Sequence, residues 1–216
     1  MQCKAIKTAI CFLGLITILN TKLSWADNWK LEKQKNNVSI YSKQTDSGYK
    51  EILVKTTVET NPHTLIALLA DVSFSSKWID NCLEVKILNE ASPSERLIHT
   101  FFAAPWPVKD RDMVTLSTTT FTNNTFQITI SDRNDATPHH PKYVRMQNMH
   151  GLWEANALEN GKSEITYTGG GNPGGKLPTF IANKEMISSM FKTFQNLKKV
   201  ILLDEYQPID TQASLN

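Results

Sequence analysis

The residues that first suggest chemistry lie in the stretch GGGNPGGKLP, at positions 169–178. Gly170, Gly175 and Lys176 match the pattern G-x-x-x-x-G-K, in which backbone N–H groups and a lysine hold nucleotide phosphates between a strand and a helix. However, a leucine follows the lysine, so the hydroxyl that would bind Mg²⁺ is missing. A nucleotide-binding domain would also need an acid that holds Mg²⁺ and further parallel strands after it. The candidate acid, Asp204, follows the nearest apolar run, and too few residues come after it for such strands. We therefore interpret the stretch as a turn that leads into a helix.

Two other groups of side chains have atoms that could bind or react. His139 and His140, together with Asp132 and Asp135, have the atoms that metal ions prefer. They lie in SDRNDATPHHPK, a polar segment with prolines that is typical of a solvated hairpin loop, and we predict no metal site there. Cys82 is the one cysteine outside the first 26 residues, and we interpret it as a small buried hydrophobe rather than a reactive thiol.

The N-terminus has the features of a secretory signal peptide, residues 1–26. Two lysines precede the apolar run 8–19, and the small residues Ser24 and Ala26 precede the expected cut. The apolar run is too short to span a bilayer, so a permanent membrane anchor is the less favoured alternative. We predict that the protein is cut after Ala26 and is periplasmic or secreted.

Charge does not point to nucleic acid. The chain has 23 Lys and Arg against 21 Asp and Glu, and three of the lysines lie in the predicted signal peptide. The mature chain therefore has 20 basic and 21 acidic side chains, a formal net charge of −1, and no basic tract remains. Its length is that of one domain, which we place at residues 27–208, followed by a short tail at 209–216.

Alternation of apolar and polar residues dominates the mature chain and predicts half-buried strands. Such stretches lie at 51–59, 83–87, 125–130 and 164–167. Turn residues separate neighbouring stretches, as in ENG at 159–161, so the strands are expected to pair as antiparallel hairpins.

Two segments have helical spacing instead. The segment 61–79 begins with Asn61 as a candidate N-cap and has Pro62 at the first helical position. After Pro178 one apolar stripe runs toward the C-terminus and through VILLD (200–204), which we interpret as the last turns of the same helix. The stripe consists of Phe180, Ile187, Met190, Phe191, Phe194, Leu197 and Ile201.

These elements predict an α+β fold in which a curved antiparallel sheet wraps around a long C-terminal helix. A sheet of this size cannot close tightly on itself, so the helix is expected to cover its concave face and leave an apolar internal cavity. Cavities of this kind are where small ligands bind.

Three blocks of sequence carry a family resemblance. FFAAPWPVKDRDMV (101–114) resembles the P-x-P…R-D-x-V signature of START (steroidogenic acute regulatory protein-related lipid-transfer) domains. The segment 151–183 is similar to the G-x-W…D-P-G-G-x-[IL]-P segment of the same family, with Asn172 where aspartate is usual. The segment 68–82 is similar to the helix of that family that runs into a tryptophan. Because the blocks follow in order, the chain is identified as a bacterial, exported, single-domain member of the helix-grip superfamily.

The resemblance implies a helix-grip fold around a cavity that holds one lipid or sterol-like molecule. It further implies that the protein binds this molecule and transfers it as a monomer, without catalysis, cofactor or nucleic acid, and through transient membrane contact. The residues expected to contact the lipid are Phe102, Trp106, Arg111, Met113, Thr115, Trp153, Tyr167, Ile187, Met190 and Phe194.

One departure from the family bears on the ligand. Several lipid-binding relatives carry a second arginine, six residues after the arginine of the signature, that points into the cavity; here that position is Ser117. A buried cation needs an anionic partner, so its absence favours a neutral or weakly polar ligand. Arg111 and Asp112 are expected mainly to have structural roles at the start of their strand. Trp106 lies in the loop that the family places at the cavity entrance, where it would touch a membrane or cap the edge of the sheet.

Two alternatives to lipid transfer remain open. A polyketide cyclase-like enzyme would need polar groups that converge in the cavity, with Tyr167, His99 and His150 as candidates. A domain with a residual cavity would instead bind a partner protein.

Overall fold

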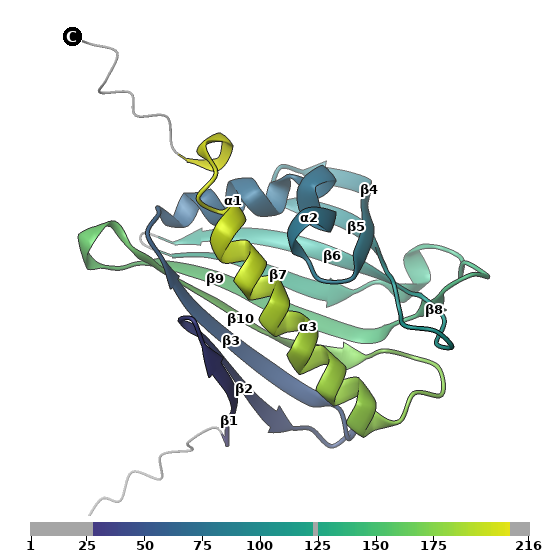
Figure 1. Cartoon of the computed structure of the whole chain (residues 1–216). Coiled ribbons are helices and arrows are strands. Elements are labelled where there is room, and N and C mark those ends of the chain that lie inside the picture. Colours follow the sequence, from purple (N-terminus) through teal and green to yellow (C-terminus); the bar gives the residue numbers. More distant parts are fainter. Residues whose placement is uncertain (1–27, 123–124, 208–216) are drawn as a thin grey trace, which may run out of the picture.

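The computed structural model describes residues 28–122 and 125–207 (Figure 1). The predicted signal peptide with its cut after Ala26, and the predicted tail at 209–216, lie outside the described residues. The elements follow in chain order: β1 (Lys30–Lys35), β2 (Val38–Gln44), β3 (Lys50–Val58), α1 (Pro62–Ala70), η1 (Val72–Phe74), α2 (Ser75–Trp78), β4 (Cys82–Ser92), β5 (Glu95–Phe102), β6 (Arg111–Thr122), β7 (Thr125–Asp132), η2 (Asn134–Ala136), β8 (Val144–Arg145), β9 (Gln147–Ala157), η3 (Glu159–Gly161), β10 (Ser163–Asn172), α3 (Thr179–Val200) and η4 (Asp204–Tyr206).

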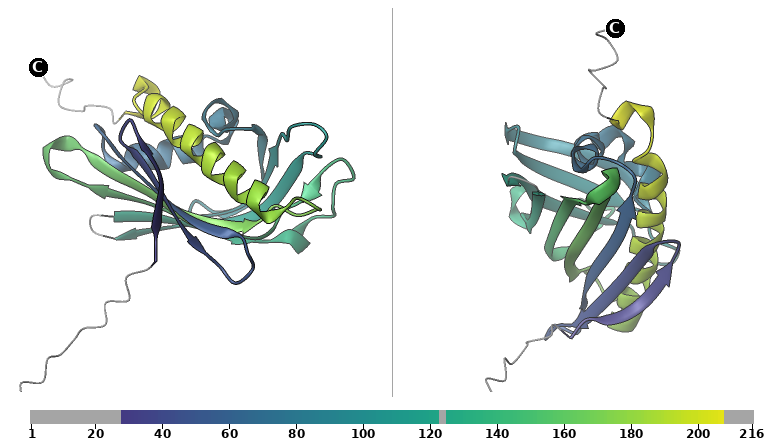
Figure 2. Two further views of the ribbon diagram at one scale, coloured as in Figure 1. Left: turned by 60° about the horizontal axis from the view of Figure 1, so that its bottom comes forward. Right: turned by 90° about the vertical axis from the view of Figure 1, so that its left-hand side faces the viewer.

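The strands form one sheet in the order β1-β2-β3-β10-β9-β7-β6-β5-β4. Every neighbouring pair in this order is antiparallel, whereas the short strand β8 pairs with the start of β6 in parallel. The sheet is curved, and α3 lies across its concave side (Figure 2). The predicted α+β helix-grip architecture is confirmed.

The helical segment after Asn61 begins as predicted. The Asn61 side chain accepts a hydrogen bond from the backbone N–H of His63 at 2.8 Å, and Pro62 occupies the first helical position of α1. The segment does not continue as one helix, because Asp71 ends α1 and caps η1 through its carboxylate, which accepts from the N–H of Phe74 at 3.2 Å. The chain therefore turns into α2, which ends at Trp78 beside the cavity.

The long helix α3 has 22 residues and is held at both edges. On one edge, Asn183 bonds to the β2–β3 hairpin and the Lys198 ammonium donates to the β1–β2 turn. On the other edge, Thr193 accepts from the backbone N–H of Asp80 at 3.0 Å and Asn196 donates to the carbonyl of Trp78. These contacts fix the helix over the middle of the sheet.

The prediction that this helix continues through 200–204 is wrong. α3 ends at Val200, and the side-chain amide of Gln207 donates to the carbonyl of Ile201, which a further helical turn would otherwise use. Ile201 is fully buried, whereas Leu202 and Leu203 are 49% and 41% exposed, so the apolar pattern outlasts the helix.

The glycine-rich stretch is the turn between β10 and α3, as predicted. Gly174 and Gly175 both have a φ of +72°, a conformation that favours glycine. A Cβ on Gly174 would lie 2.6 Å from the carbonyl oxygen of Arg145, while one on Gly175 would meet no atom closer than 3.5 Å. Backbone geometry and close packing thus account for the glycines, and Lys176 beside them is exposed.

The hydrophobic core lies under the C-terminal half of α3. There Phe194, Leu197 and Ile201 pack with no exposed surface against β2, β3, β9 and α1. Under the N-terminal half of the same helix, the side chains of the described residues leave a space unfilled.

Candidate ligand cavity

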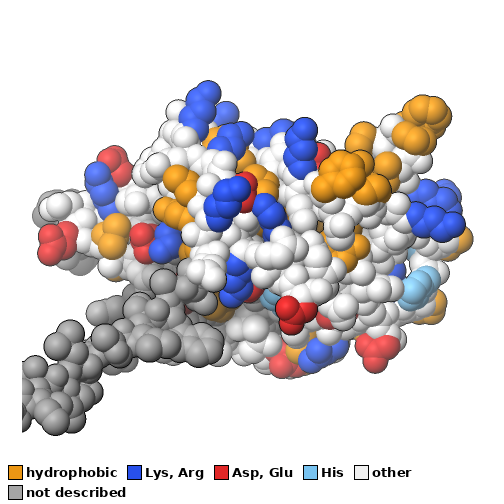
Figure 3. Space-filling view, turned by 90° about the horizontal axis from the view of Figure 1, so that it is seen from below, with side chains coloured by type: hydrophobic (Ala, Val, Ile, Leu, Met, Phe, Trp, Pro, Cys, Tyr) orange, Lys and Arg blue, Asp and Glu red, His pale blue; other side chains and the backbone are white. Residues whose placement is uncertain are grey.

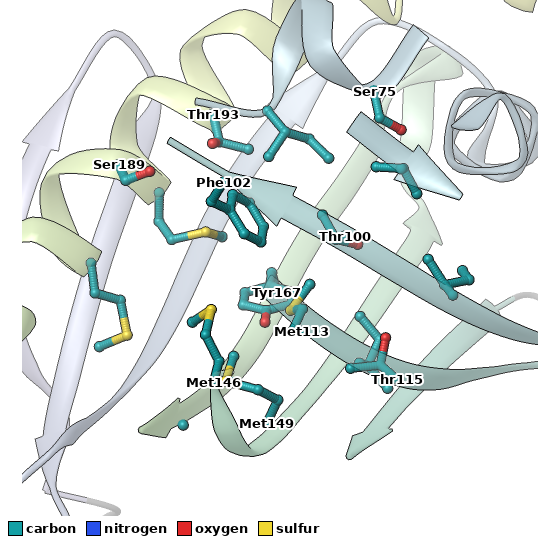
Figure 4. Close-up of a pocket in the computed structure, with 18 of the residues that line it drawn as sticks. Ser75, Thr100, Phe102, Met113, Thr115, Met146, Met149, Tyr167, Ser189 and Thr193 are labelled. Atoms are coloured by element: carbon teal, nitrogen blue, oxygen red, sulfur yellow. The ribbon is translucent and has the colours of Figure 1, made fainter. Parts of the chain in front are cut away.

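A cavity of about 860 Å³ lies between the N-terminal half of α3 and the concave face of β5, β6, β9 and β10 (Figure 4). The segment from α1 to β4 closes one side, through residues that include Ile66, Leu69, Trp78 and Ile79. The volume lies within the range of small-molecule sites, roughly 300–1,000 Å³. The predicted internal cavity is therefore present, and it is large enough for a small hydrophobic molecule.

Strand β6 contributes a continuous row to the lining. Arg111, Met113, Thr115 and Ser117 all border the cavity, as alternation along a strand requires, while Asp112 between them faces the other side. Phe102, which pairs with Arg111 across β5 and β6, borders the cavity as well. The sequence therefore predicted correctly which face of β6 lines the cavity.

Five methionines among the described residues border the cavity. Met113, Met146, Met149, Met186 and Met190 all border it, and the first three surround the space below Tyr167 in Figure 4. A thioether side chain has several rotatable bonds and adapts to the shape of whatever it contacts. Such a lining accommodates ligands of variable shape.

Tyr167 lies flat on the sheet because two glycines leave room for it. Gly151 and Gly169 are paired across β9 and β10, and a Cβ on either would lie 2.8 or 2.6 Å from the Tyr167 hydroxyl oxygen. No described residue forms a hydrogen bond with this hydroxyl, which Figure 4 shows near Met113 and Met146. Burial raises its pKa to about 12, so it stays protonated and can donate a hydrogen bond to a ligand.

Trp153 separates the cavity from the core. Its ring contacts Tyr167 on the cavity side at 4.8 Å between centroids and stacks on Phe194 on the core side at 5.4 Å. Trp78 meets it edge-on at 6.3 Å. Trp153 is 6% exposed, and it forms part of both the cavity wall and the hydrophobic core.

The expected contribution of α3 to the cavity needs correction. Met190 borders the cavity, but Ile187 and Phe194 do not; Phe194 belongs to the buried core, and Ile187 is partly buried and packs against it. One apolar stripe serves two purposes, because Phe194 is fully buried in the core while Met190 also borders the cavity. The cavity-facing residues of the first turns are instead Ile181, Ala182, Glu185, Met186 and Ser189.

Two large hydrophobic side chains project into solvent at one end of the cavity. Trp106 is 92% exposed, and it does not border the cavity although its neighbours Pro105 and Val108 do. Phe180, expected on the buried stripe, lies in the first turn of α3 and is 73% exposed. We call this region the loop end, formed by loop 103–110, β8 and residues 173–181.

The three parts of the loop end contact one another directly. The backbone N–H of Val144 in β8 donates to the carbonyl of Asp110 at 2.9 Å, and Gly174 packs against Val144 and Arg145. Figure 3 shows exposed hydrophobic side chains gathered toward one end of the face seen from below.

A buried polar cluster that the sequence did not reveal lies on the opposite face of β6. The Asp112 carboxylate is fully buried and accepts hydrogen bonds from His99 Nε2 at 2.8 Å and from Arg145 Nε at 3.0 Å. The Arg145 Nη2 atom lies 2.9 Å from the same carboxylate oxygen in an ion pair. Burial alone would raise the pKa of Asp112, but the bonds and charges of Arg145 and His99 outweigh it and lower the pKa. The cluster therefore joins β5, β6 and β8 behind the cavity.

The candidates for proton transfer do not converge. His99 belongs to the cluster behind the sheet and does not border the cavity, whereas Tyr167 and His150 do. His150 is exposed and lies 3.8 Å from the Glu51 carboxylate. Tyr167 stands without an ionisable partner among the described residues.

The remaining candidates for chemistry have structural roles. Burial raises the pKa of the Cys82 thiol to about 11, so it is not a nucleophile at neutral pH. Asp132 caps the loop after β7, where its carboxylate accepts from the backbone N–H groups of Asn134 and Met149. Within residues 28–122 and 125–207, no three His, Cys, Asp or Glu side chains are placed to hold a metal ion.

Fold and cavity together define a helix-grip protein with an internal hydrophobic site. The model of the START domain family matches residues 18–203, and the chain belongs to this family. An uncharacterized protein of Pseudomonas aeruginosa is 30% identical over 175 residues, which is 80% of this chain and 86% of the relative.

Solved structures share the fold at low identity. A STAR-related lipid transfer protein from Xanthomonas axonopodis superposes with a TM-score of 0.75 at 21% identity, over 82% of this chain and 100% of the other. Human StAR-related lipid transfer protein 5 superposes with a TM-score of 0.74 at 18% identity, over 82% of this chain and 87% of the other. An aromatase/cyclase from Streptomyces superposes with a TM-score of 0.50 at 13% identity, over 70% of this chain and 90% of the other.

Proposed function

We propose that the protein binds one lipid or sterol-like molecule in the cavity and transfers it between membranes, without catalysing a reaction. The observation that carries the proposal is the cavity of about 860 Å³ lined mainly by apolar side chains and methionines. The names of the START relatives, which describe lipid transfer, support it. The cyclase alternative receives less support, because a lone tyrosine with a pKa raised to about 12 has no described base beside it.

Mass spectrometry of the purified protein tests the proposal. We expect a hydrophobic molecule at close to one copy per chain in wild type. Met113→Trp should fill part of the cavity and reduce the bound amount severalfold. Thr118→Trp is the control and should leave the bound amount unchanged. Thr118 lies six residues after Asp112 on β6, so its side chain is on the same outer face of the sheet. Wild-type protein that carries no such molecule, and takes none up from vesicles, would contradict lipid binding.

The proposal includes membrane contact at the loop end through Trp106 and Phe180. Indole and phenyl side chains this exposed gain free energy when they enter the membrane interface. No helix in the described part of the chain is long and apolar enough to span a membrane.

Vesicle binding checks this contact. Trp106→Ala and Phe180→Ala should each weaken binding to lipid vesicles by about tenfold. Leu158→Ala is the matched control, because Leu158 is 45% exposed but lies past the far end of β9. Equal effects of the three substitutions would show that the loop end is not the contact surface.

We further propose that the protein works as a monomer in the periplasm or outside the cell. The signal-peptide pattern of residues 1–26 supports export. N-terminal sequencing of the mature protein should give Asp27 as its first residue, and an intact apolar run 8–19 would contradict export with cleavage.

A further inference from the structure

Arg111 is the first residue of β6 and lines the cavity at the loop end. It pairs with Phe102 on β5 and with Val144 on β8, so both of its neighbours across the sheet are apolar. The residue is only 8% exposed. Its guanidinium is thus a cation held at the boundary of an apolar cavity.

The hydrogen-bonding capacity of this guanidinium is largely unused. It has five N–H donors, and the one described bond runs from Nη1 to the backbone carbonyl of Lys109. No carboxylate of the described residues lies within ion-pair distance of it. Burial lowers its pKa, while the charge of Asp110 acts in the opposite direction; the Asp110 carboxylate itself accepts from the N–H of Ala104.

The other buried or cavity-lining arginines are paired. Arg96, also in the cavity lining, bonds to Glu90 at 2.9 Å, and Arg145 bonds to Asp112 on the outer face. A buried charge without a partner is costly, whereas a guanidinium that meets an oxyanion forms charge-assisted and often bidentate hydrogen bonds. Arg111 therefore lacks the partner that its two counterparts have.

We propose that the polar end of the ligand is an oxyanion, a carboxylate or a phosphate, and that Arg111 binds it at the loop end of the cavity. This inference rests on the proposed lipid binding and narrows it to anionic amphiphiles. The apolar tail then lies along Met113 and Thr115, which follow Arg111 on the same face of β6. The position of Ser117 pointed to a neutral ligand; Arg111 supplies a cation at a different place on the same strand.

Three probes of one chain length test the proposal: a long-chain fatty acid, the alkyl phosphate and the primary alcohol. Binding of each is measured by calorimetry to wild type, Arg111→Gln, Arg111→Lys and Arg133→Gln, the last at an exposed arginine that does not border the cavity. One of the two anions should bind wild type at least about tenfold more tightly than the alcohol, and that anion identifies the head group. Arg111→Gln should remove this preference and leave alcohol binding unchanged. Arg111→Lys should keep part of it, and Arg133→Gln all of it.

The wild-type comparison stands even if Arg111→Gln does not fold. Equal affinity of wild type for the alcohol and both anions would overturn the oxyanion proposal and leave lipid binding intact. An anion preference that persists in folded Arg111→Gln would overturn the assignment to Arg111. Failure of all three probes to bind would overturn lipid binding, and this inference with it.

Discussion

Replacing Phe194 by alanine should lower the free energy of unfolding by about 3–5 kcal/mol. The side chain has no exposed surface, and its ring stacks on Trp153 at 5.4 Å. Its removal would leave a void in the core under α3, because the surrounding β-strands are fixed in one sheet and cannot close on it. Urea denaturation measures the loss.

Met190→Ala is the matched control for this prediction. It lies one turn earlier on the same helix, but it is only partly buried at the edge of the core and also borders the cavity. Its removal should enlarge an existing space, cost clearly less stability than Phe194→Ala, and change ligand affinity more. Equal losses of stability from the two substitutions would contradict the division of α3 into a core half and a cavity half.

Asp112→Ala should cost a similar amount, about 3–5 kcal/mol, for an electrostatic reason. The Asp112 and Arg145 side chains are each 1% exposed, so the substitution leaves a buried guanidinium without its carboxylate. The double variant Asp112→Ala, Arg145→Met removes both charges and should be more stable than the single variant. Chemical denaturation measures the free energy of unfolding of both variants. A double variant that is no more stable than the single variant would contradict the electrostatic explanation.

The same carboxylate gives the wild type a pH dependence. The pKa of Asp112 is lower in the folded protein than in the unfolded chain, so its ionised form stabilises the fold above the unfolded pKa. This contribution is lost as the pH falls through the folded pKa. The free energy of unfolding of wild type should therefore begin to decrease below about pH 4, more steeply than that of the double variant.

Local patterns in the sequence predicted what depends on local geometry. Alternation identified four of the strands, β3, β4, β7 and β10, since successive side chains on a strand must point to opposite faces. The family resemblance, together with the same alternation, identified the cavity-facing row of β6. Asn61 and Pro62 identified the start of α1, because a helix N-terminus needs an acceptor for its free N–H groups and tolerates proline there.

The features that could not be predicted from the sequence depend on contacts between residues that are distant in the chain. His99, Asp112 and Arg145 lie on three different strands, and no pattern in the chain brings them together. The apolar stripe of α3 is uniform, so it could not show that Phe194 faces a filled core while Met190 faces a cavity. Phe180 continues the stripe, but its side chain is 73% exposed.

The division of α3 also means that its two halves should exchange their amide hydrogens at different rates. The half near Phe194 is held by the core, so its amides should exchange only when the whole domain unfolds. The half near Met186 covers a cavity and has fewer buried contacts, and such regions open locally at a smaller cost in free energy. A molecule could then enter or leave through the opening of one half of a helix while the other half keeps the sheet folded.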